Sequence, residues 1–204
     1  MKDGRRERGA RTQEALVAAA GDLFVEQGYT RTTLTEVATR AGVSARTVYV
    51  RFDTKADLLK RVLDVAVVGD LEERPLRDRE WIERAMTAPT LPERIDAFAT
   101  GSAALHQRLA PLMAIAMQAE ATEPVIAEAS RAGREGTQAM VREFWTRAQR
   151  DALVPAGIEL DWVVETAFVL GSADTAVLRL RTVGLDEYAT WLRRAFLLLA
   201  TAPT

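Results

Sequence analysis

Apolar residues recur at helical spacing along most of the chain. The pattern i, i+3, i+4, i+7, i+8 begins at Leu16 and ends at Phe24, and Gly28 is placed to end the helix that it predicts. Sustained alternation of apolar and polar residues, which is typical of strands, is almost absent. The pattern therefore predicts an all-α fold.

Three shorter helices are predicted between residues 33 and 66. Thr33 opens a capping box with the carboxylate three residues further on, and Gly42 ends the helix that it starts. Ser44 is placed to cap the next helix. Thr54 marks the start of the third, which carries an apolar stripe.

Longer helices are predicted beyond this point. Nine of the fourteen residues from 71 to 84 are charged, so we expect a solvated connection or a frayed short helix there. Thr90 opens a second capping box, and Pro111 is expected to break or kink the helix that follows, before a short apolar helix. Pro124 opens a long helix that reaches Arg150.

The last two predicted helices, residues 162–181 and 185–200, are apolar on nearly all sides. A surface helix is polar opposite its apolar stripe, so both helices need a second burial partner. The small residues Gly171, Ser172 and Ala173 permit close approach. We interpret the pair as half of a four-helix homodimer interface, because a small domain has few places to bury both faces. The alternative is two core helices of a monomer.

Composition limits the chemistry that the chain can support. Its 204 residues are 48% apolar and 27% charged, as in an ordinary globular protein of one or two domains. The absence of Cys excludes disulfides, thiol catalysis and zinc–thiolate sites, and the single histidine, His106, excludes a His-rich metal site. We expect no metal and no cofactor. The polar N-terminus and interrupted apolar runs predict a soluble, cytoplasmic protein with no membrane partner.

Charge is unevenly distributed, although the formal net charge is only −2. Residues 1–61 contain 12 basic and 8 acidic side chains, a net charge of +4, whereas the remainder contains 15 and 21, a net charge of −6. A basic module on an acidic body indicates a polyanion partner, with chance as the alternative. The N-terminal arm, Lys2–Arg11, carries five basic and two acidic residues. It either reaches a minor groove or is a disordered solubilising tail.

Residues 34–52 have the pattern of a helix-turn-helix, in which the second helix presents its N-terminal end to base edges in the major groove. Val48 is expected to point to the core, which leaves Arg46, Thr47 and Val50 facing outward. Arg46 is the expected base reader, because a guanidinium fits the O6 and N7 atoms of guanine. The side chains placed to hold phosphates are Thr33, Ser44, Thr47, Tyr49 and Lys55.

The segment from Phe24 to Leu59 resembles the DNA-binding domain of the tetracycline-repressor (TetR) family of transcriptional regulators. The resemblance covers about the first third of the chain, and the rest agrees only in its helices and its apolar closing pair. The matching positions are Phe24, Gly28, Tyr29, Thr33, Val37, Ala38, Ala41, Gly42, Val43, Ser44, Thr47, Tyr49, Phe52, Lys55, Leu58 and Leu59.

The resemblance implies an all-α fold of about nine helices, with a helix-turn-helix domain in residues 1–60 and a helical ligand-binding and dimerisation domain in residues 61–204. It also implies a homodimer that binds a double-stranded DNA operator, in most members as a repressor, until a small molecule releases it. The chain departs from the family pattern at Val50, at Arg51 and at Asp53, to which no function is attached. Val50 is suited to contact a thymine methyl group and Arg51 to contact a phosphate, so the operator sequence is not transferable.

A pocket for the effector is expected to be mostly apolar, with a few polar groups, and to take an apolar or aromatic molecule. Each candidate has an alternative as an ordinary core residue, and for His106 a half-buried structural role is also open. Asp174 either pairs with an arginine such as Arg179 or lies at the dimer interface. The candidates are Phe98, His106, Met113, Met117, Gln118, Phe144, Trp145, Trp162 and Phe168.

Two other functions are less well supported by the sequence. An enzyme with His106 as general base lacks support, because the local sequence Ala-Leu-His-Gln-Arg supplies no acidic partner. A helical interaction module that has lost DNA binding is disfavoured by the intact set of hydroxyls and Lys55. The sequence favours a ligand-responsive DNA-binding repressor that is not an enzyme.

Overall fold

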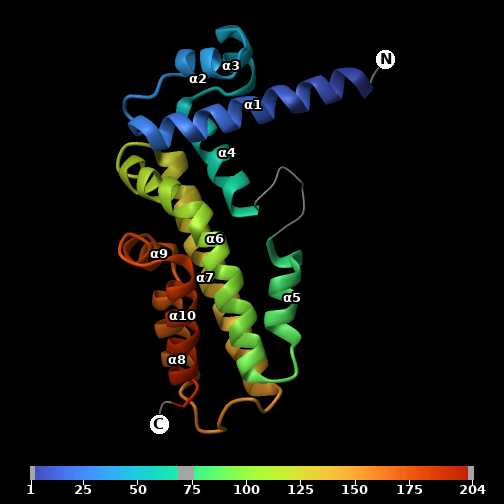
Figure 1. Cartoon of the computed structure of the whole chain (residues 1–204), viewed down its shortest axis with the longest axis vertical. Helices are drawn as coiled ribbons and strands as arrows, with labels where there is room; N and C mark the ends of the chain where they lie inside the picture. Colours follow the sequence, from blue (N-terminus) through green and yellow to red (C-terminus); the bar gives the residue numbers. More distant parts are fainter. Residues whose placement is uncertain (1–2, 69–75, 202–204) are drawn as a thin grey trace. The chain divides into compact units, whose positions relative to one another are not determined.

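The structure is a computed structural model that describes residues 3–68 and 76–201, and all regular structure in these residues is helical (Figure 1). The expected all-α fold is confirmed, with ten α-helices described against about nine expected. They are α1 (Asp3–Gln27), α2 (Leu34–Arg40), α3 (Ala45–Arg51), α4 (Lys55–Val68), α5 (Glu80–Thr87), α6 (Leu91–Ala119), α7 (Pro124–Arg150), α8 (Leu160–Leu170), α9 (Ala173–Arg179) and α10 (Leu185–Leu199), together with the 3-10 turn η1 (Leu76–Asp78).

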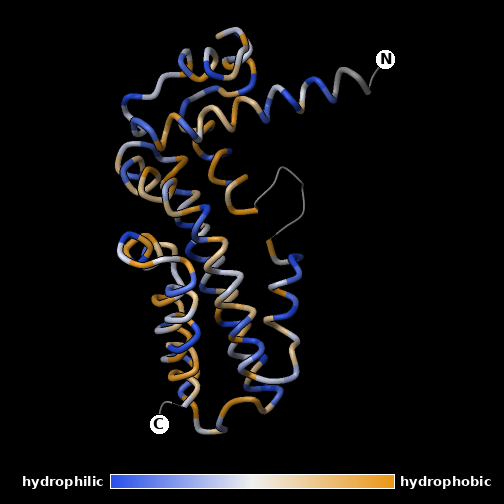
Figure 2. Tube along the Cα trace, in the orientation of Figure 1, coloured by the Kyte–Doolittle hydropathy of each residue, from blue (hydrophilic) through white to orange (hydrophobic). Residues whose placement is uncertain are grey.

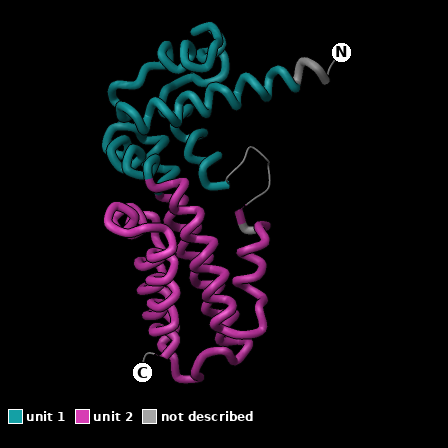
Figure 3. The backbone as a smooth tube through the Cα atoms, in the orientation of Figure 1, with its two compact units in different colours: residues 1–71, 111–130 teal, residues 72–110, 131–204 magenta. Residues whose placement is uncertain are grey.

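The chain divides into two compact units (Figure 3). Unit 1 comprises residues 1–71 and 111–130, and unit 2 comprises residues 72–110 and 131–204. Helices α6 and α7 each contribute residues to both units. The functional boundary between residues 60 and 61 stays a prediction, because this division reflects packing alone.

The core of unit 1 is built from the apolar stripes of α1 to α4. Leu16, Phe24, Val48 and Leu58 are completely buried in it. The hydropathy colouring shows the repeating hydrophobic positions along these helices (Figure 2). Residues 111–130 join the same core through Leu112, Ile115, Ala116, Ala119 and Ile126.

The core of unit 2 is aromatic. Phe98 of α6 stacks on Phe196 of α10 with ring centroids 5.1 Å apart. Eight residues further along α6, His106 meets Tyr188, which lies eight residues earlier on α10. The two helices therefore run antiparallel where they pack.

Pro111 does not break its helix as the sequence predicted. Helix α6 runs without interruption from Leu91 to Ala119. A proline inside a helix removes one backbone hydrogen bond, and burial of neighbouring apolar side chains can outweigh that loss. Leu112 and Ile115, directly after it, are buried in the core of unit 1.

The single helix predicted over residues 162–181 is also wrong. Helix α8 ends at Leu170 with Gly171 as its C-cap, and α9 begins after Ser172, whose Oγ accepts a hydrogen bond from the amide of Thr175. The small residues therefore mark a helix end and a new cap. A Cβ built on Gly171 would lie 3.1 Å from the Ala167 carbonyl oxygen, a tight contact, and 3.6 Å from Phe196, an ordinary van der Waals distance.

The charged connection contains more order than a frayed helix. Helix α5 buries Ile82, Ala85 and Met86. Residues 71–75 of the connection, like Lys2 of the N-terminal arm, lie outside the described residues. Within the part of the chain that is described, no helix is both long and apolar enough to span a membrane.

Candidate functional site

Helices α2 and α3 and the turn between them form the helix-turn-helix predicted from the sequence. The capping box at α2 is present: the amide of Thr33 donates to Glu36 at 2.9 Å, and the amide of Glu36 donates to Thr33 Oγ1 at 3.2 Å. In the turn, Gly42 adopts φ +68°, a left-handed conformation that favours glycine. The amide of Val43 donates to the Ala38 carbonyl at 3.0 Å, which closes the turn.

Helix α3 has one buried face and one open face. Ser44 caps it by accepting a hydrogen bond from the amide of Thr47 at 3.2 Å, as predicted. Val48 is its one buried residue. Tyr49 and Val50 are 56% and 76% exposed, although both are large and apolar or aromatic. Side chains of this kind left open to solvent are available to a partner.

The predicted DNA-contacting residues are mostly exposed on this helix-turn-helix. Thr33, Ser44, Arg46 and Arg51 are open to solvent, and Thr47 is half-buried with its hydroxyl 2.8 Å from that of Ser44. Lys55 differs from them. Its Nζ is directed to three backbone carbonyl oxygens, and burial lowers its pKa against the opposing effect of Glu123.

The described part of the N-terminal arm is helical, because α1 begins at Asp3. Residues 7–15 of α1 are exposed or half-buried, and Leu16 is the first buried residue after them. A Cβ built on Gly9 would lie 3.3 Å from Arg51 Nη2. The guanidinium of Arg51 therefore lies against α1, beside the arm.

Three predicted effector residues lie together in unit 2. The rings of Phe98 and Phe144 are 5.4 Å apart, and those of Phe144 and Trp145 are 5.3 Å apart. Phe196 joins them, 5.9 Å from Trp145. Phe196 was not among the predicted effector residues, and the apolar character of residues 185–200 is the sequence signal that includes it. The buried Trp145 Nε1 has no hydrogen-bond partner among the residues that the structure describes.

The remaining candidates, apart from His106, are distributed over both units. Met113, Met117 and Gln118 belong to unit 1, where Met117 is 46% exposed. Trp162 is 48% exposed, and Phe168 packs partly against the core of unit 2. Phe168 therefore borders the core that contains the aromatic cluster, whereas Trp162 is open to solvent.

His106 is a buried structural group in this fold. Its Nδ1 lies 3.1 Å from the hydroxyl oxygen of Tyr188. Burial lowers the pKa of His106 to about 4 and raises that of Tyr188, so both are neutral near pH 7. Asp174 is exposed, and Arg179 lies over the ring of Trp191, 5.1 Å from its centroid.

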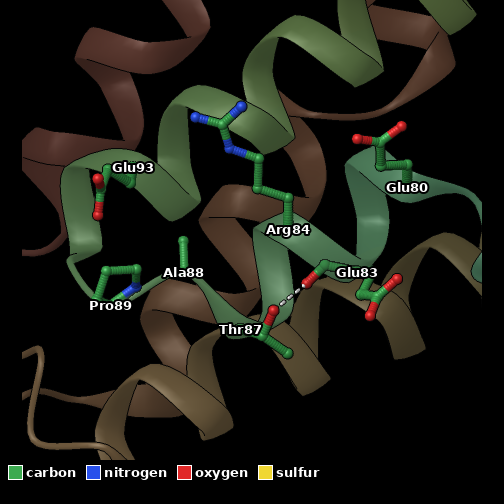
Figure 4. Close-up of a pocket in the computed structure, with 7 residues that line it drawn as sticks. All are labelled: Glu80, Glu83, Arg84, Thr87, Ala88, Pro89 and Glu93. Carbon is green, nitrogen blue, oxygen red and sulfur yellow. Dashed lines mark hydrogen bonds between the residues drawn. The ribbon is translucent and has the colours of Figure 1, made fainter.

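One open pocket of about 310 Å³ lies where α5 meets the start of α6 (Figure 4). It differs from the expected effector pocket because three glutamates and an arginine line it, and it contains none of the candidate effector residues. Its lining residues are Glu80, Glu83, Arg84, Thr87, Ala88, Pro89 and Glu93.

Comparison with known proteins assigns the helix-turn-helix segment to a family. Residues 16–62 match the model of bacterial regulatory proteins of the tetR family. A stretch of 54 residues is 39% identical to the HTH-type transcriptional repressor BepR of Brucella suis. That match spans 26% of this chain and 26% of the length of BepR.

Solved structures extend the likeness to the fold of nearly the whole chain. A TetR transcription regulator from Haloarcula marismortui gives a TM-score of 0.70 at 17% identity, over 94% of this chain and 97% of that chain. The SmeT–triclosan complex gives a TM-score of 0.68 at 21% identity, over 92% and 90%. The helix-turn-helix segment, residues 16–62, is therefore similar to the bacterial regulatory proteins of the tetR family, and the fold of nearly the whole chain is similar to that of solved regulators of this type.

Proposed function

We propose that the protein is a ligand-responsive DNA-binding transcriptional regulator, and that it represses transcription until a small molecule releases it from its operator. The observation that carries this proposal is the solvent-exposed face of α3. This helix is positioned by α2, because both helices have N-caps and a turn that contains Gly42 joins them. The resemblance of this segment to a repressor supports the sign of regulation. Acting on DNA, the protein would work in the cytoplasm.

The proposed contacts divide into base and phosphate contacts. Arg46 reads guanine and Val50 contacts a thymine methyl group, since both are exposed on α3. The phosphate contacts come from side chains around the ends of α2 and α3, where hydroxyls and a guanidinium are open to solvent. They are Thr33, Ser44, Thr47, Tyr49 and Arg51.

A second copy of the chain is the proposed partner. Trp162, Val169, Leu178 and Leu198 are between 48% and 67% exposed on α8 to α10. Exposed apolar side chains on neighbouring elements mark interaction sites. A two-fold dimer would present its two recognition helices to half-sites about 34–36 Å apart, one turn of DNA.

The proposed effector is an apolar or aromatic molecule that carries a hydrogen-bond acceptor. Trp145 Nε1 is the supporting observation, because a buried N–H without a partner is unfavourable by about 1–3 kcal/mol, which an acceptor on the ligand would recover. Its surroundings are the rings of Phe98, Phe144 and Phe196. SmeT, which has a similar fold, was solved with triclosan, an aromatic compound.

The deciding experiment selects binding sites from random-sequence duplex DNA and then compares wild-type protein with Arg46→Ala. The variant should bind the selected duplex about 1–3 kcal/mol more weakly, and wild-type affinity should fall steeply with salt. Arg181→Ala, an exposed arginine of unit 2, is the matched control and should bind as wild type does. Failure to enrich any sequence would contradict the proposal, and unchanged binding by Arg46→Ala would contradict the assignment of the base reader.

A further inference from the structure

The ammonium of Lys55 is fully engaged within unit 1. Lys55 is the first residue of α4, and its Nζ donates to the carbonyl oxygens of Tyr29 at 2.7 Å, Thr30 at 3.4 Å and Thr32 at 3.0 Å. An ammonium has three donors and no acceptor, so each donor has a partner. Nζ also lies 4.2 Å from the centroid of the Tyr29 ring, within the range of a cation–π interaction.

These three carbonyls belong to the loop between α1 and α2. Carbonyl groups after the end of a helix lack intrahelical partners and favour a nearby cation. Thr32, which is 1% exposed, braces the same loop by donating from Oγ1 to the Gly28 carbonyl at 2.9 Å. The next residue is Thr33, the N-cap of α2. Lys55 therefore holds the segment that determines where α2 begins.

We propose that Lys55 is a positioning residue for the helix-turn-helix and does not contact DNA phosphate, an inference that rests on the proposed function. To reach a phosphate, the ammonium would have to leave these three carbonyl oxygens. Breaking hydrogen bonds to a charged group is more costly than breaking neutral ones. Arg51, at the end of α3, is exposed and remains the suitable phosphate contact.

The same loop is contacted from residues 111–130. Burial raises the pKa of the Tyr29 phenol, and the carboxylate of Glu123, which lies beside it, raises that pKa further. Tyr29 thus stands between Lys55 of α4 and Glu123 at the corner between α6 and α7. The loop before α2 therefore interacts both with α4, through Lys55, and with this corner, through Glu123.

The test compares Lys55→Met with wild type on two duplexes, the selected operator and a scrambled one of equal length. A displaced α2 misaligns α3, so the ratio of specific to non-specific affinity should fall about tenfold while the slope of log affinity against log salt stays unchanged. Removal of a phosphate contact would instead weaken binding to both duplexes equally. It would also reduce the slope of log affinity against log salt by about 1. Arg51→Met is the matched control for this second behaviour.

A measurement without DNA completes the test. Hydrogen exchange of the free protein should show the amides of residues 32–37 exchanging about tenfold faster in Lys55→Met, with those of unit 2 unchanged, because the opening is local. Unaltered exchange in residues 32–37, or the uniform loss of affinity with a reduced salt slope, would overturn the proposal. If wild-type protein distinguishes no duplex, the proposed function fails, and the exchange result still decides whether Lys55 positions α2.

Discussion

At Gly101, the absence of a single carbon determines how α5 packs on α6. A Cβ built there would lie 2.2 Å from the ring of Trp81, closer than any real contact allows. The pattern of apolar positions along α6 does not predict this requirement for glycine, because Trp81 is twenty residues away in the sequence. The indole in turn meets Phe98 edge-on, with ring centroids 6.3 Å apart, so the glycine supports the aromatic core of unit 2.

Gly101→Ala should therefore destabilise the protein by about 1–3 kcal/mol, because the indole must move out of a well-packed core. Gly133→Ala is the matched control: this glycine also lies within a helix, but a Cβ there meets nothing within 4 Å. The control should be neutral or more stable by up to about 1 kcal/mol, since alanine favours helix. Urea unfolding measures both, and equal midpoints for the two variants would contradict this account.

His106 makes the stability of the protein depend on pH. Its pKa is lowered to about 4 by burial, below the ordinary value of about 6.5, so between these values the unfolded chain binds a proton that the folded one does not. The free energy of unfolding should then decrease as pH falls through this window, by about 2 kcal/mol between pH 7 and pH 5.

The check for His106 is urea unfolding at both pH values, with His106→Gln as the comparison. The variant keeps a polar side chain near Tyr188 but has no group that titrates in this window. It should lose most of the decrease between pH 7 and pH 5. A wild-type protein that is equally stable at both values would show that the imidazole is not buried as a neutral group.

At the scale of elements, helix ends are set by caps whose signals are local. The capping box of α2 and the serine cap of α3 were both predicted from the sequence and are confirmed. The cap of α9 at Ser172 was not predicted, because the surrounding residues are apolar and continue a helical pattern. Where a cap signal lies within an apolar run, packing decides whether the helix continues.

The cap of α3 allows stability and DNA binding to be separated. Ser44→Ala removes the acceptor for the Thr47 amide and should destabilise the protein by about 1 kcal/mol, whereas Ser44→Asp retains an acceptor and should leave stability near wild type. Both should weaken binding to the selected duplex, and the aspartate more, because its charge would face phosphates. Thermal unfolding measures the stability of the two variants, and titrations with the selected duplex measure their binding affinity. An aspartate variant that bound as tightly as wild type would place Ser44 away from DNA.

At the scale of the whole molecule, the exposed apolar residues of α8 to α10 predict self-association. Val169→Glu, at a position 58% exposed, should shift the protein from dimer to monomer in sedimentation equilibrium, because it places a charge in an apolar interface. The same variant should lose affinity for a two-half-site operator, since two recognition helices would no longer be linked.

The control for self-association is Thr182→Glu, a charge added at an exposed polar position between α9 and α10. It should remain a dimer. A wild-type protein that sediments as a monomer at all concentrations would contradict the homodimer, and the closing helices would then be core helices with apolar side chains left in solvent.

The candidate site was predictable to different degrees in its two halves. The helix-turn-helix depends on spacing within about twenty residues, so its caps, its turn glycine and the inward position of Val48 were predicted and are confirmed. The effector residues were predicted only from side-chain type. Phe98, Phe144 and Trp145 do meet, but Met117 and Trp162 are largely exposed, because burial depends on helices that are distant in sequence.

The sequence by itself determined the all-α fold, the helix-turn-helix and most helix boundaries, because hydrophobic periodicity and capping act over one or two turns. Only the tertiary structure decided that α6 continues through Pro111, that residues 111–130 pack with the helix-turn-helix, and that Lys55 bonds to three loop carbonyls. Each of these depends on contacts between residues far apart in the chain. Their energies arise when the core is assembled, and no local pattern records them.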